Sequence, residues 1–303
     1  MPDNRITVVM ITRNRGDQIR TALGHLQQLP EHPRLIVVDN GSSDGTVAVA
    51  RSMGAPVEVL ALHENLGSGG RNVGVSKATT PYVAFSDDDS WWQPGALSRA
   101  ADLFDADPTL GLLAARILVG PDQKLDPLSH AMATSPLAGP DSRSSGRVGV
   151  PIVGFAACGT VIRRSAFLET GGFERRFGVG GEEQVLALDL LRKGWQMVYV
   201  DEIVAYHHPS PVRDPAKRMR HEVRNALWSA WLRRPARSAW AATRQILRSA
   251  LGDPSRLAGV RDAFAGLPWI LPSRRPVPVE IDCQLQQAEE AWIASSQLET
   301  FQS

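Results

Sequence analysis

The 303-residue chain lacks the features that define several common protein classes. It has two cysteines, Cys158 and Cys283, which are too few to cross-link a chain of this length and do not have the spacing of metal ligands. No apolar run approaches the ~18 residues that cross a bilayer, and the first such run is followed by Arg13 and Arg15 instead of a signal-peptide cleavage site. We therefore expect a cytoplasmic protein without a membrane span.

Two glycine-rich signatures of nucleotide-binding proteins are also missing. No G-x-x-x-x-G-K-[ST] string occurs, which argues against a P-loop kinase or NTPase. Residues 64–74 (ENLGSGGRNVG) are rich in glycine, but Asn72 stands where the dinucleotide-binding fingerprint requires glycine. The composition is otherwise globular, with 43% hydrophobic and 21% charged residues, which excludes intrinsically disordered and fibrous classes.

Short β-rich runs alternate with helical patterns in the first hundred residues. Alternation of this kind predicts an α/β fold with a mostly parallel sheet flanked by helices. In such sheets ligands bind beyond the carboxyl ends of the strands, so the residues after each strand are candidate site residues. We expect strands at residues 6–11, 35–38, 57–62 and 82–85, and helices at residues 18–29, 46–52 and 95–104.

A net charge of +1 conceals a basic C-terminal region. Residues 213–275 hold 14 Lys and Arg against 4 Asp and Glu, a net charge of +10, so the other 240 residues carry −9. Apolar residues recur at every fourth position in residues 219–231, and apolar residues at positions 246, 247, 250 and 251 continue a helical spacing. We therefore expect two or three helices within residues 213–275. We expect two domains, residues 1–212 and a basic helical extension over residues 213–303, with a loosely held end from residue 277 onward.

Three carboxylates follow the strand expected at residues 82–85. In the string FSDDDSWW, Asp87, Asp88 and Asp89 repel one another at close range unless a cation or many donors neutralise them. Oxygen ligands suit Mg²⁺ or Mn²⁺. The alternative is a solvated acidic turn. Trp91 and Trp92 come next, and they are expected either to stack on a sugar or to pack in the core.

Another carboxylate, Asp39, ends the strand expected at residues 35–38. Turn and helix-cap chemistry accounts for the residues that follow it in the string VVDNGSSDGT. It does not account for Asp39, which we expect to face the crevice and accept hydrogen bonds from a base or a sugar.

These motifs, in this order and spacing, resemble the family-2 nucleotide-sugar glycosyltransferases of GT-A fold. The strings are TVVMITRNR, VVDNGSSDGT, ENLGSGGRNVG and FSDDDSWW, at residues 7–15, 37–46, 64–74 and 85–92. The match covers about two-thirds of the chain and leaves the basic extension outside it. The resemblance implies a GT-A-type sheet with an α-helical C-terminal extension, a nucleoside-diphosphate sugar donor and a divalent cation, Mg²⁺ or Mn²⁺.

The resemblance also implies roles for individual residues on the donor side. The resemblance implies that Asp89 binds the cation, which bridges the donor diphosphate and stabilises the leaving nucleotide. His207 follows the strand expected at residues 197–200, and the resemblance has it complete the metal shell. The implied nucleotide-sugar ligands are Thr12, Asn14, Asp39, Arg71, Asn72, Asp87 and Asp88.

On the acceptor side, the resemblance makes Glu183 the general base in a single displacement with inversion. Glu182 is the reserve for this role, and Trp91 and Trp92 are the implied acceptor contacts. A helix is expected to run from these glutamates to residue 192, so the alternative is that both only complement its dipole. This sequence has Glu where the family usually has Asp, and Val185 where an Asp is common.

The predicted function is metal-dependent, inverting transfer from a UDP- or dTDP-linked sugar to a hydroxyl of a glycan, a lipid-linked molecule or a small molecule. The alternatives are a nucleotidyltransferase and a non-catalytic sugar-nucleotide-binding subunit. For the basic extension, a helical cap, peripheral contact with the inner membrane face and homodimerisation stay open. Nucleic acid is not expected, since no recognition motif accompanies the charge.

Overall fold

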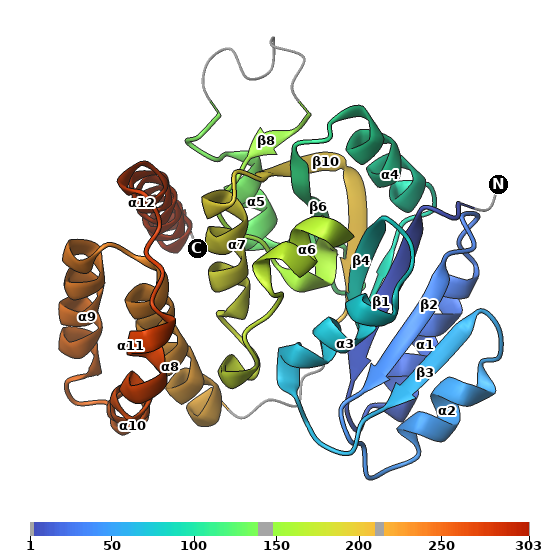
Figure 1. Cartoon of the computed structure of the whole chain (residues 1–303), viewed down its shortest axis with the longest axis horizontal. Helices are drawn as coiled ribbons and strands as arrows, with labels where there is room; N and C mark the ends of the chain where they lie inside the picture. Colours follow the sequence, from blue (N-terminus) through green and yellow to red (C-terminus); the bar gives the residue numbers. More distant parts are fainter. Residues whose placement is uncertain (1–2, 139–147, 210–214, 303) are drawn as a thin grey trace.

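A mixed, curled sheet forms the centre of the protein in a computed structural model that describes residues 3–138, 148–209 and 215–302. Its strands run in the order β3-β2-β1-β4-β9-β6-β10-β5, with β7 beside β6 and β8 beside β10 (Figure 1). The pairs β1–β2, β2–β3, β1–β4 and β6–β10 are parallel. The α/β class predicted from the alternating pattern is confirmed.

The first half of the chain folds as the sequence pattern predicts. Each expected strand forms, and its bounds shift by no more than two residues. The helix expected at residues 46–52 has those bounds in the structure. The strands are β1 (Ile6–Thr12), β2 (Arg34–Asp39), β3 (Val57–Ala61) and β4 (Tyr82–Asp87), and the helices are α1 (Gly16–Gln27), α2 (Thr46–Ser52), α3 (Gly70–Lys77) and α4 (Ala96–Ala106).

Residues 90–207 supply the remaining strands and three more helices around the sheet. β10 continues to His207 beyond the strand expected at residues 197–200, because an irregularity between Val200 and Val204 lets it pair again with β6. The strands are β5 (Ser90–Trp92), β6 (Leu110–Val119), β7 (Lys124–Leu125), β8 (Val150–Pro151), β9 (Thr160–Arg163) and β10 (Gln196–His207). The helices are α5 (Pro127–Ala133), α6 (Arg164–Thr170) and α7 (Glu182–Arg192), with single 3₁₀ turns η1 (Gly67–Gly69), η2 (Ala157–Gly159) and η3 (Arg175–Phe177).

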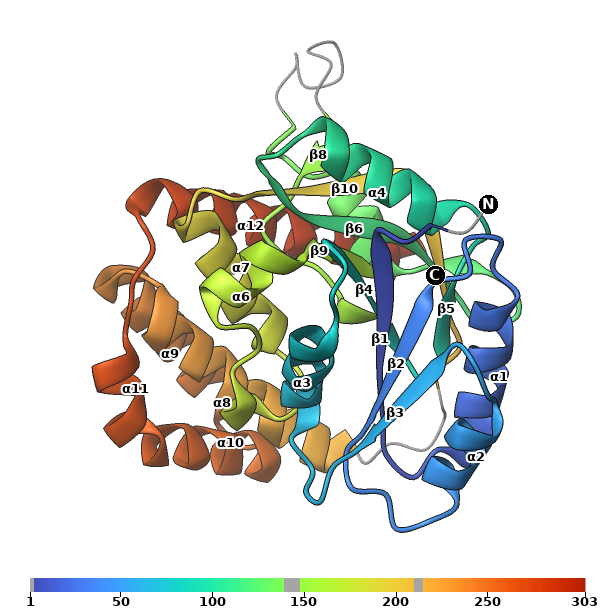
Figure 2. The same ribbon diagram turned by 45° about the vertical axis from the view of Figure 1, so that its right-hand side comes forward.

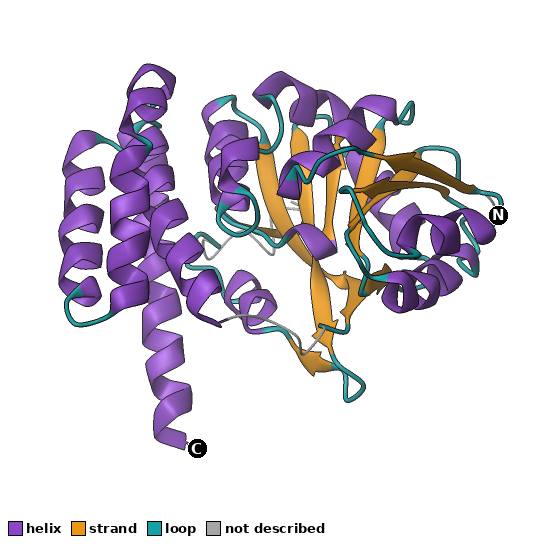
Figure 3. Ribbon diagram, turned by 90° about the horizontal axis from the view of Figure 1, so that it is seen from below, coloured by secondary structure: helices purple, strands orange, loops and turns teal. Residues whose placement is uncertain are grey.

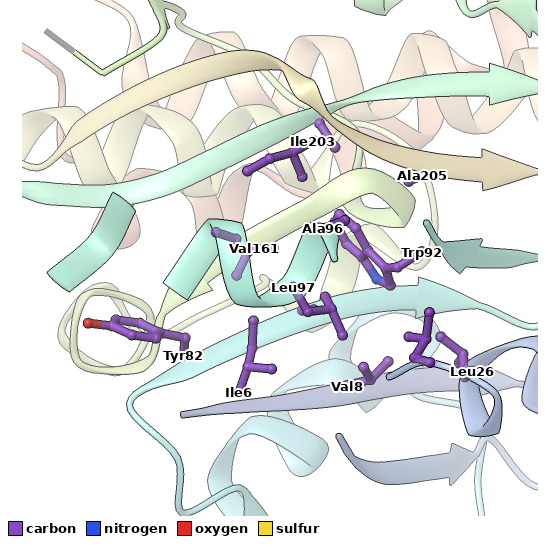
Figure 4. Packing of buried hydrophobic residues seen from close by; sticks show 14 of the residues in the cluster. Ile6, Val8, Leu26, Tyr82, Trp92, Ala96, Leu97, Val161, Ile203 and Ala205 are labelled. Atoms are coloured by element: carbon purple, nitrogen blue, oxygen red, sulfur yellow. The ribbon is translucent and has the colours of Figure 1, made fainter. Parts of the chain in front are cut away.

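Helices cover both faces of the sheet, because successive residues of a strand point to opposite sides. On β1, Val8 packs in a cluster with Leu97 of α4 and Trp92 (Figure 4), whereas Val9 packs in a second cluster with Phe85 and residues of α3, α6 and α7. Figure 2 shows α1 and α2 on one side of β1–β3 and α3 on the other. Full burial of such side chains stabilises the fold by about 1.5–3 kcal/mol each.

Residues 215–275 form four helices, where the sequence pattern predicted two or three, and a fifth helix follows, so five helices lie beyond the sheet. They are α8 (Pro215–Arg233), α9 (Ala236–Ala250), α10 (Pro254–Ala265), α11 (Leu267–Ser273) and α12 (Val279–Gln302), and they gather on one side of the sheet (Figure 3). A third cluster joins Phe177 and Val185 to Leu227 and Trp228 of α8, so these helices cap the sheet-bearing part. Within the described residues no helix is both long and apolar enough to cross a membrane.

The expectation of a loosely held end after residue 277 is wrong. α12 docks through Asp282, which is 3% exposed and accepts a 2.8 Å hydrogen bond from Arg234. Arg234 also pairs with Glu289 of α12 at 2.9 Å, and Leu285 is buried. The polar sequence after residue 277 did not indicate this contact, because Arg234, the partner of Asp282, lies 48 residues earlier in the chain.

Candidate functional site

The carboxyl ends of three neighbouring strands bring most of the predicted site residues together. In the sheet register Thr12 is opposite Asp39 on β2, and Ile11 is opposite Asp87 on β4. The glycine-rich residues 64–70 lead into α3 at the same edge of the sheet.

The loops after β1 and β2 are tied to each other by polar side chains. Asp39 is 2% exposed, and it accepts hydrogen bonds from the backbone N–H of Ser42, at 2.9 Å, and from the Ser42 hydroxyl. The Ser42 Oγ in turn accepts from Asn14 N, and the Asn14 Oδ1 accepts from Ser43 N, both at 2.9 Å. The Asp39 carboxylate therefore organises the turn that lies beside Asn14.

Asn40 holds the glycine-rich loop and was missed by sequence reasoning. Its Nδ2 donates to Gly67 O at 3.0 Å, and its Oδ1 accepts from Leu66 N at 3.2 Å. A Cβ at Gly70 would lie 2.9 Å from the same Oδ1. The sequence interpretation explained residues 41–46 by turn chemistry and gave Asn40 no role, because no local signal reveals a partner 27 residues away.

The three consecutive carboxylates point toward three different partners. Asp87 forms an ion pair with Arg71, whose side chain is buried. Asp88 accepts a 2.8 Å hydrogen bond from Thr12 Oγ1, and burial raises the pKa of Asp88 to about 7. The structure thus separates the charges of the triplet instead of gathering them around one point.

The third carboxylate, Asp89, lies beside His207. The antiparallel β5–β10 pairing puts His207 opposite Ser90, and the Asp89 Oδ1 is 3.5 Å from the His207 Nε2. Two ligands of one ion with bonds of about 2.1 Å have donor atoms about 3 Å apart, so the pair fits a shared cation. Groups of three His, Cys, Asp or Glu side chains able to hold a metal are absent from the described ranges.

Arg71 also connects the acidic triplet to the start of α7. Its Nη1 is 4.0 Å from the Glu182 Oε1. Glu182 is 1% exposed, and its Oε2 has no hydrogen-bond partner in the part of the chain that the structure describes. Burial and the neighbouring Glu183 raise the pKa of Glu182 above its usual range, and Arg71 opposes this shift. Glu183, by contrast, is partly exposed.

Asn72 and the glycine-rich loop fasten the region before α7. Asn72 Nδ2 donates to Phe173 O at 2.8 Å, and its Oδ1 accepts from Phe173 N at 2.9 Å. Ser68 N donates to Gly178 O at 2.7 Å, and a Cβ at Gly67 would lie 2.5 Å from that oxygen. Only glycine fits at position 67, where two loops approach this closely.

The two tryptophans after the triplet differ in their surroundings. Trp92 is 1% exposed in the first core cluster, which matches the packing alternative for this residue (Figure 4). Trp91 is half-buried and stacks on His25 with ring centroids 4.1 Å apart. It also contacts His208, next to the Asp89–His207 pair. Their acceptor role stays a prediction.

Known proteins similar to this chain identify its family. Residues 7–171 match the family model described as glycosyl transferase family 2. The chain is 26% identical over 253 residues to the N-acetylglucosaminyl-diphospho-decaprenol L-rhamnosyltransferase of Mycobacterium tuberculosis, covering 71% of this chain and 80% of that protein. It is 30% identical over 223 residues to the pre-mycofactocin glycosyltransferase of the same species, covering 70% of this chain and 45% of that protein.

The fold is similar to that of a solved mannosyltransferase. The structure of PcManGT from Pyrobaculum calidifontis, in complex with GDP-Man and Mn²⁺, matches with a TM-score of 0.57 at 20% identity. The match covers 99% of this chain and 81% of that one. The chain therefore belongs to glycosyl transferase family 2, and it is a glycosyltransferase of GT-A fold.

Proposed function

We propose that this glycosyltransferase moves a sugar from a UDP- or dTDP-linked donor to an acceptor hydroxyl, with inversion and with a bound divalent cation. The observation that carries the proposal is the bridge made by Arg71, which joins Asp87 of the acidic triplet to Glu182 at the start of α7. Arg71 thereby connects a proposed nucleotide-sugar ligand, Asp87, to the start of α7, where the proposed base Glu183 follows Glu182. A rhamnosyltransferase relative supports sugar transfer, and a structural neighbour bound to GDP-Man supports the use of a nucleotide-sugar donor, without indicating uracil or thymine as its base.

The donor side, which we define as the carboxyl ends of β1, β2 and β4 with residues 64–72, would hold the nucleotide-sugar. Its proposed ligands are Thr12, Asn14, Asp39, Arg71, Asn72, Asp87 and Asp88. Asp89 and His207 would hold Mg²⁺ or Mn²⁺, and the Mn²⁺ in the PcManGT complex supports this choice of ion. When bound, such a cation stabilises the negative charge that grows on the leaving diphosphate.

The acceptor proton would pass to Glu183. As the acceptor oxygen bonds to the anomeric carbon, the bond to the nucleoside diphosphate breaks, and the leaving group keeps that electron pair. A base must be ionised and within reach of the hydroxyl. Glu183 is partly exposed, whereas Glu182 is buried with a raised pKa and is held near Arg71. We therefore assign Glu182 to positioning and Glu183 to proton removal.

The test replaces the proposed base without changing its shape. Glu183→Gln is expected to lower sugar transfer by about 10²–10⁴-fold, while Mn²⁺-dependent binding of a nucleoside diphosphate, followed by thermal shift, stays unchanged. Glu280→Gln, an exposed position at the start of α12, is the matched control with unchanged transfer.

Two results would overturn parts of this proposal. Full transfer by Glu183→Gln would remove the base assignment. Release of pyrophosphate from a nucleoside triphosphate, in place of a nucleoside diphosphate from a sugar donor, would indicate nucleotidyl transfer instead.

A further inference from the structure

A cavity of about 770 Å³ lies between the sheet-bearing part and the C-terminal helices, and we call it the tail cavity. Its walls come from α5, α8, α9 and α12, from residues 152–154 and from the start of α7. Gly180 and Gly181 line it directly before Glu182 and Glu183. Its volume is in the range of sites that bind small molecules.

The charges on the cavity wall cancel one another. Arg218 pairs with Glu222 at 2.7 Å on the same helix. Arg234 pairs with Glu289 at 2.9 Å and with Asp282 at 2.8 Å. A phosphate or carboxylate in this cavity would have to compete with these internal partners for the arginines.

Polar side chains on the wall are also engaged by the protein itself. Asn225 Nδ2 donates to Phe177 O at 3.1 Å and also to Gly180 O. Gln184 Nε2 donates to Val153 O at 3.4 Å, and Ser135 Oγ donates to Pro151 O at 2.7 Å. The hydrogen-bonding capacity that remains for the hydroxyls of a sugar is small.

Most of the rest of the wall is apolar, although Ser229 and Gln245 also line it. Trp292 and Ile293 of α12, which are 39% and 49% exposed, add large apolar groups to the lining. Such a surface gains most from an occupant without polar groups. The apolar lining also includes Leu128, Met132, Ile152, Ala226, Ala230 and Leu285.

We propose that the tail cavity binds the hydrocarbon chain of an amphiphilic acceptor whose hydroxyl-bearing head lies at Glu183. The position of the acceptor head at Glu183 rests on the proposed function. The binding of a hydrocarbon chain in the tail cavity is inferred from its largely apolar wall, on which the charged side chains pair with one another. An isoprenoid chain and a fatty acyl chain share the required chemistry, so the test includes both.

The first experiment compares acceptors that share one sugar head and differ in the attached chain. An isoprenoid chain, an acyl chain of similar length and a methyl group are used with the wild-type protein. At least one of the long-chain acceptors is expected to have a kcat/KM at least tenfold higher than that of the methyl acceptor, mainly because its KM is lower. The long-chain acceptor with the higher kcat/KM shows whether the cavity prefers an isoprenoid or an acyl chain. Equal kcat/KM for all three acceptors would overturn the proposal.

A cavity-filling variant supplies the second arm. Ala226 is exposed on α8 and lines the tail cavity, so Ala226→Trp fills the space without disturbing the core. It is expected to lower kcat/KM about tenfold for the long-chain acceptors and to leave the methyl acceptor unchanged. Ala265→Trp, on the exposed end of α10 and outside the cavity lining, is the matched control with no effect on either acceptor.

The two proposals fail in distinguishable ways. Equal loss for long and short acceptors in Ala226→Trp would overturn the tail-binding proposal and leave the glycosyl transfer intact. A dimeric wild-type protein that Ala226→Trp converts to a monomer would show that a second copy occupies the cavity, which also overturns it. Full transfer by Glu183→Gln with an unchanged chain-length preference would remove only the base assignment.

Discussion

The donor side and the tail cavity use polar residues in opposite ways. On the donor side, short loops hold polar side chains at the edge of the sheet, where Asp89 and His207 come within 3.5 Å of each other. Around the tail cavity the charged groups pair with one another, as Arg234 does with Asp282 and Glu289, and most of the remaining wall is apolar. Under the two proposals, the first region binds a charged donor and the second binds an uncharged hydrocarbon chain.

Arg71 marks the boundary between these regions. Its ion pair with Asp87 belongs to the donor side, and its 4.0 Å approach to Glu182 reaches the helix whose start also lines the tail cavity. Because a buried guanidinium stays charged, one residue compensates carboxylates on both sides. The chemistry of transfer is expected at this boundary.

Of the substitutions that compare these two regions, removal of the proposed metal carboxylate is expected to have the largest effect. Asp89→Ala should lower kcat by about 10²–10³-fold, the cost of losing one group that stabilises developing charge in a transition state. The measurement is transfer at saturating donor and Mn²⁺, with EDTA treatment of the wild type beside it. Asp122→Ala, in an exposed turn, is the control with unchanged kcat. The division between the two regions would be contradicted if EDTA-treated wild type and untreated Asp89→Ala both kept full turnover.

The next effect concerns stability at the boundary. At pH 9, above the raised pKa of Glu182, Arg71→Met leaves the ionised, buried Glu182 and the nearby Asp87 without their shared counter-charge. The substitution is expected to lower the free energy of unfolding at this pH by about 3 kcal/mol. Urea unfolding measures this. In the double variant with Glu182→Gln the cost of losing Arg71 should be smaller, because less uncompensated charge remains. Additive effects of the two substitutions would show that Arg71 and Glu182 do not interact.

The donor side was largely predictable from sequence, because its signals are local. The strands end in polar residues at one edge of the sheet, and α7 runs from Glu182 to Arg192 as expected. Asn40 was missed, since a buried asparagine in a turn motif carries no sign that it bonds to Leu66 and Gly67.

The tail cavity was not predictable, because its walls come from segments far apart in the chain. Residues near position 130, position 226 and position 288 meet there only through tertiary packing. The helix count was too low for a related reason. Gly252, with φ +87°, and the Asp253 cap with Pro254 break the region between α9 and α10, and an apolar spacing alone does not show such breaks.

A smaller loss of stability is expected from weakening the contact that holds α12 beside the tail cavity. Asp282→Asn keeps the shape of the side chain but removes the charge that faces Arg234, and a hydrogen bond between charged groups of this kind contributes about 2 kcal/mol. We expect urea unfolding to report a loss of that size, and the amides of α12 to exchange faster. Replacing Gln284, an exposed residue of α12, with Glu should change neither measurement. Unaltered exchange in Asp282→Asn would mean that apolar packing alone holds α12 in place.

The last prediction is a pH dependence of stability that follows from the raised pKa of Glu182. Because burial holds its folded-state pKa above the unfolded-state value of about 4.3, the folded protein binds the extra proton between the two values. The wild type should therefore lose stability as the pH rises through this window. Glu182→Gln has no such titrating proton, so its free energy of unfolding relative to wild type should rise between pH 5 and pH 9. Urea midpoints at the two pH values measure this, with Glu280→Gln as a control that follows the wild type. Parallel pH profiles for Glu182→Gln and wild type would place an ionised Glu182 in the folded protein, and the distinction between a positioning Glu182 and a proton-accepting Glu183 would lose its basis.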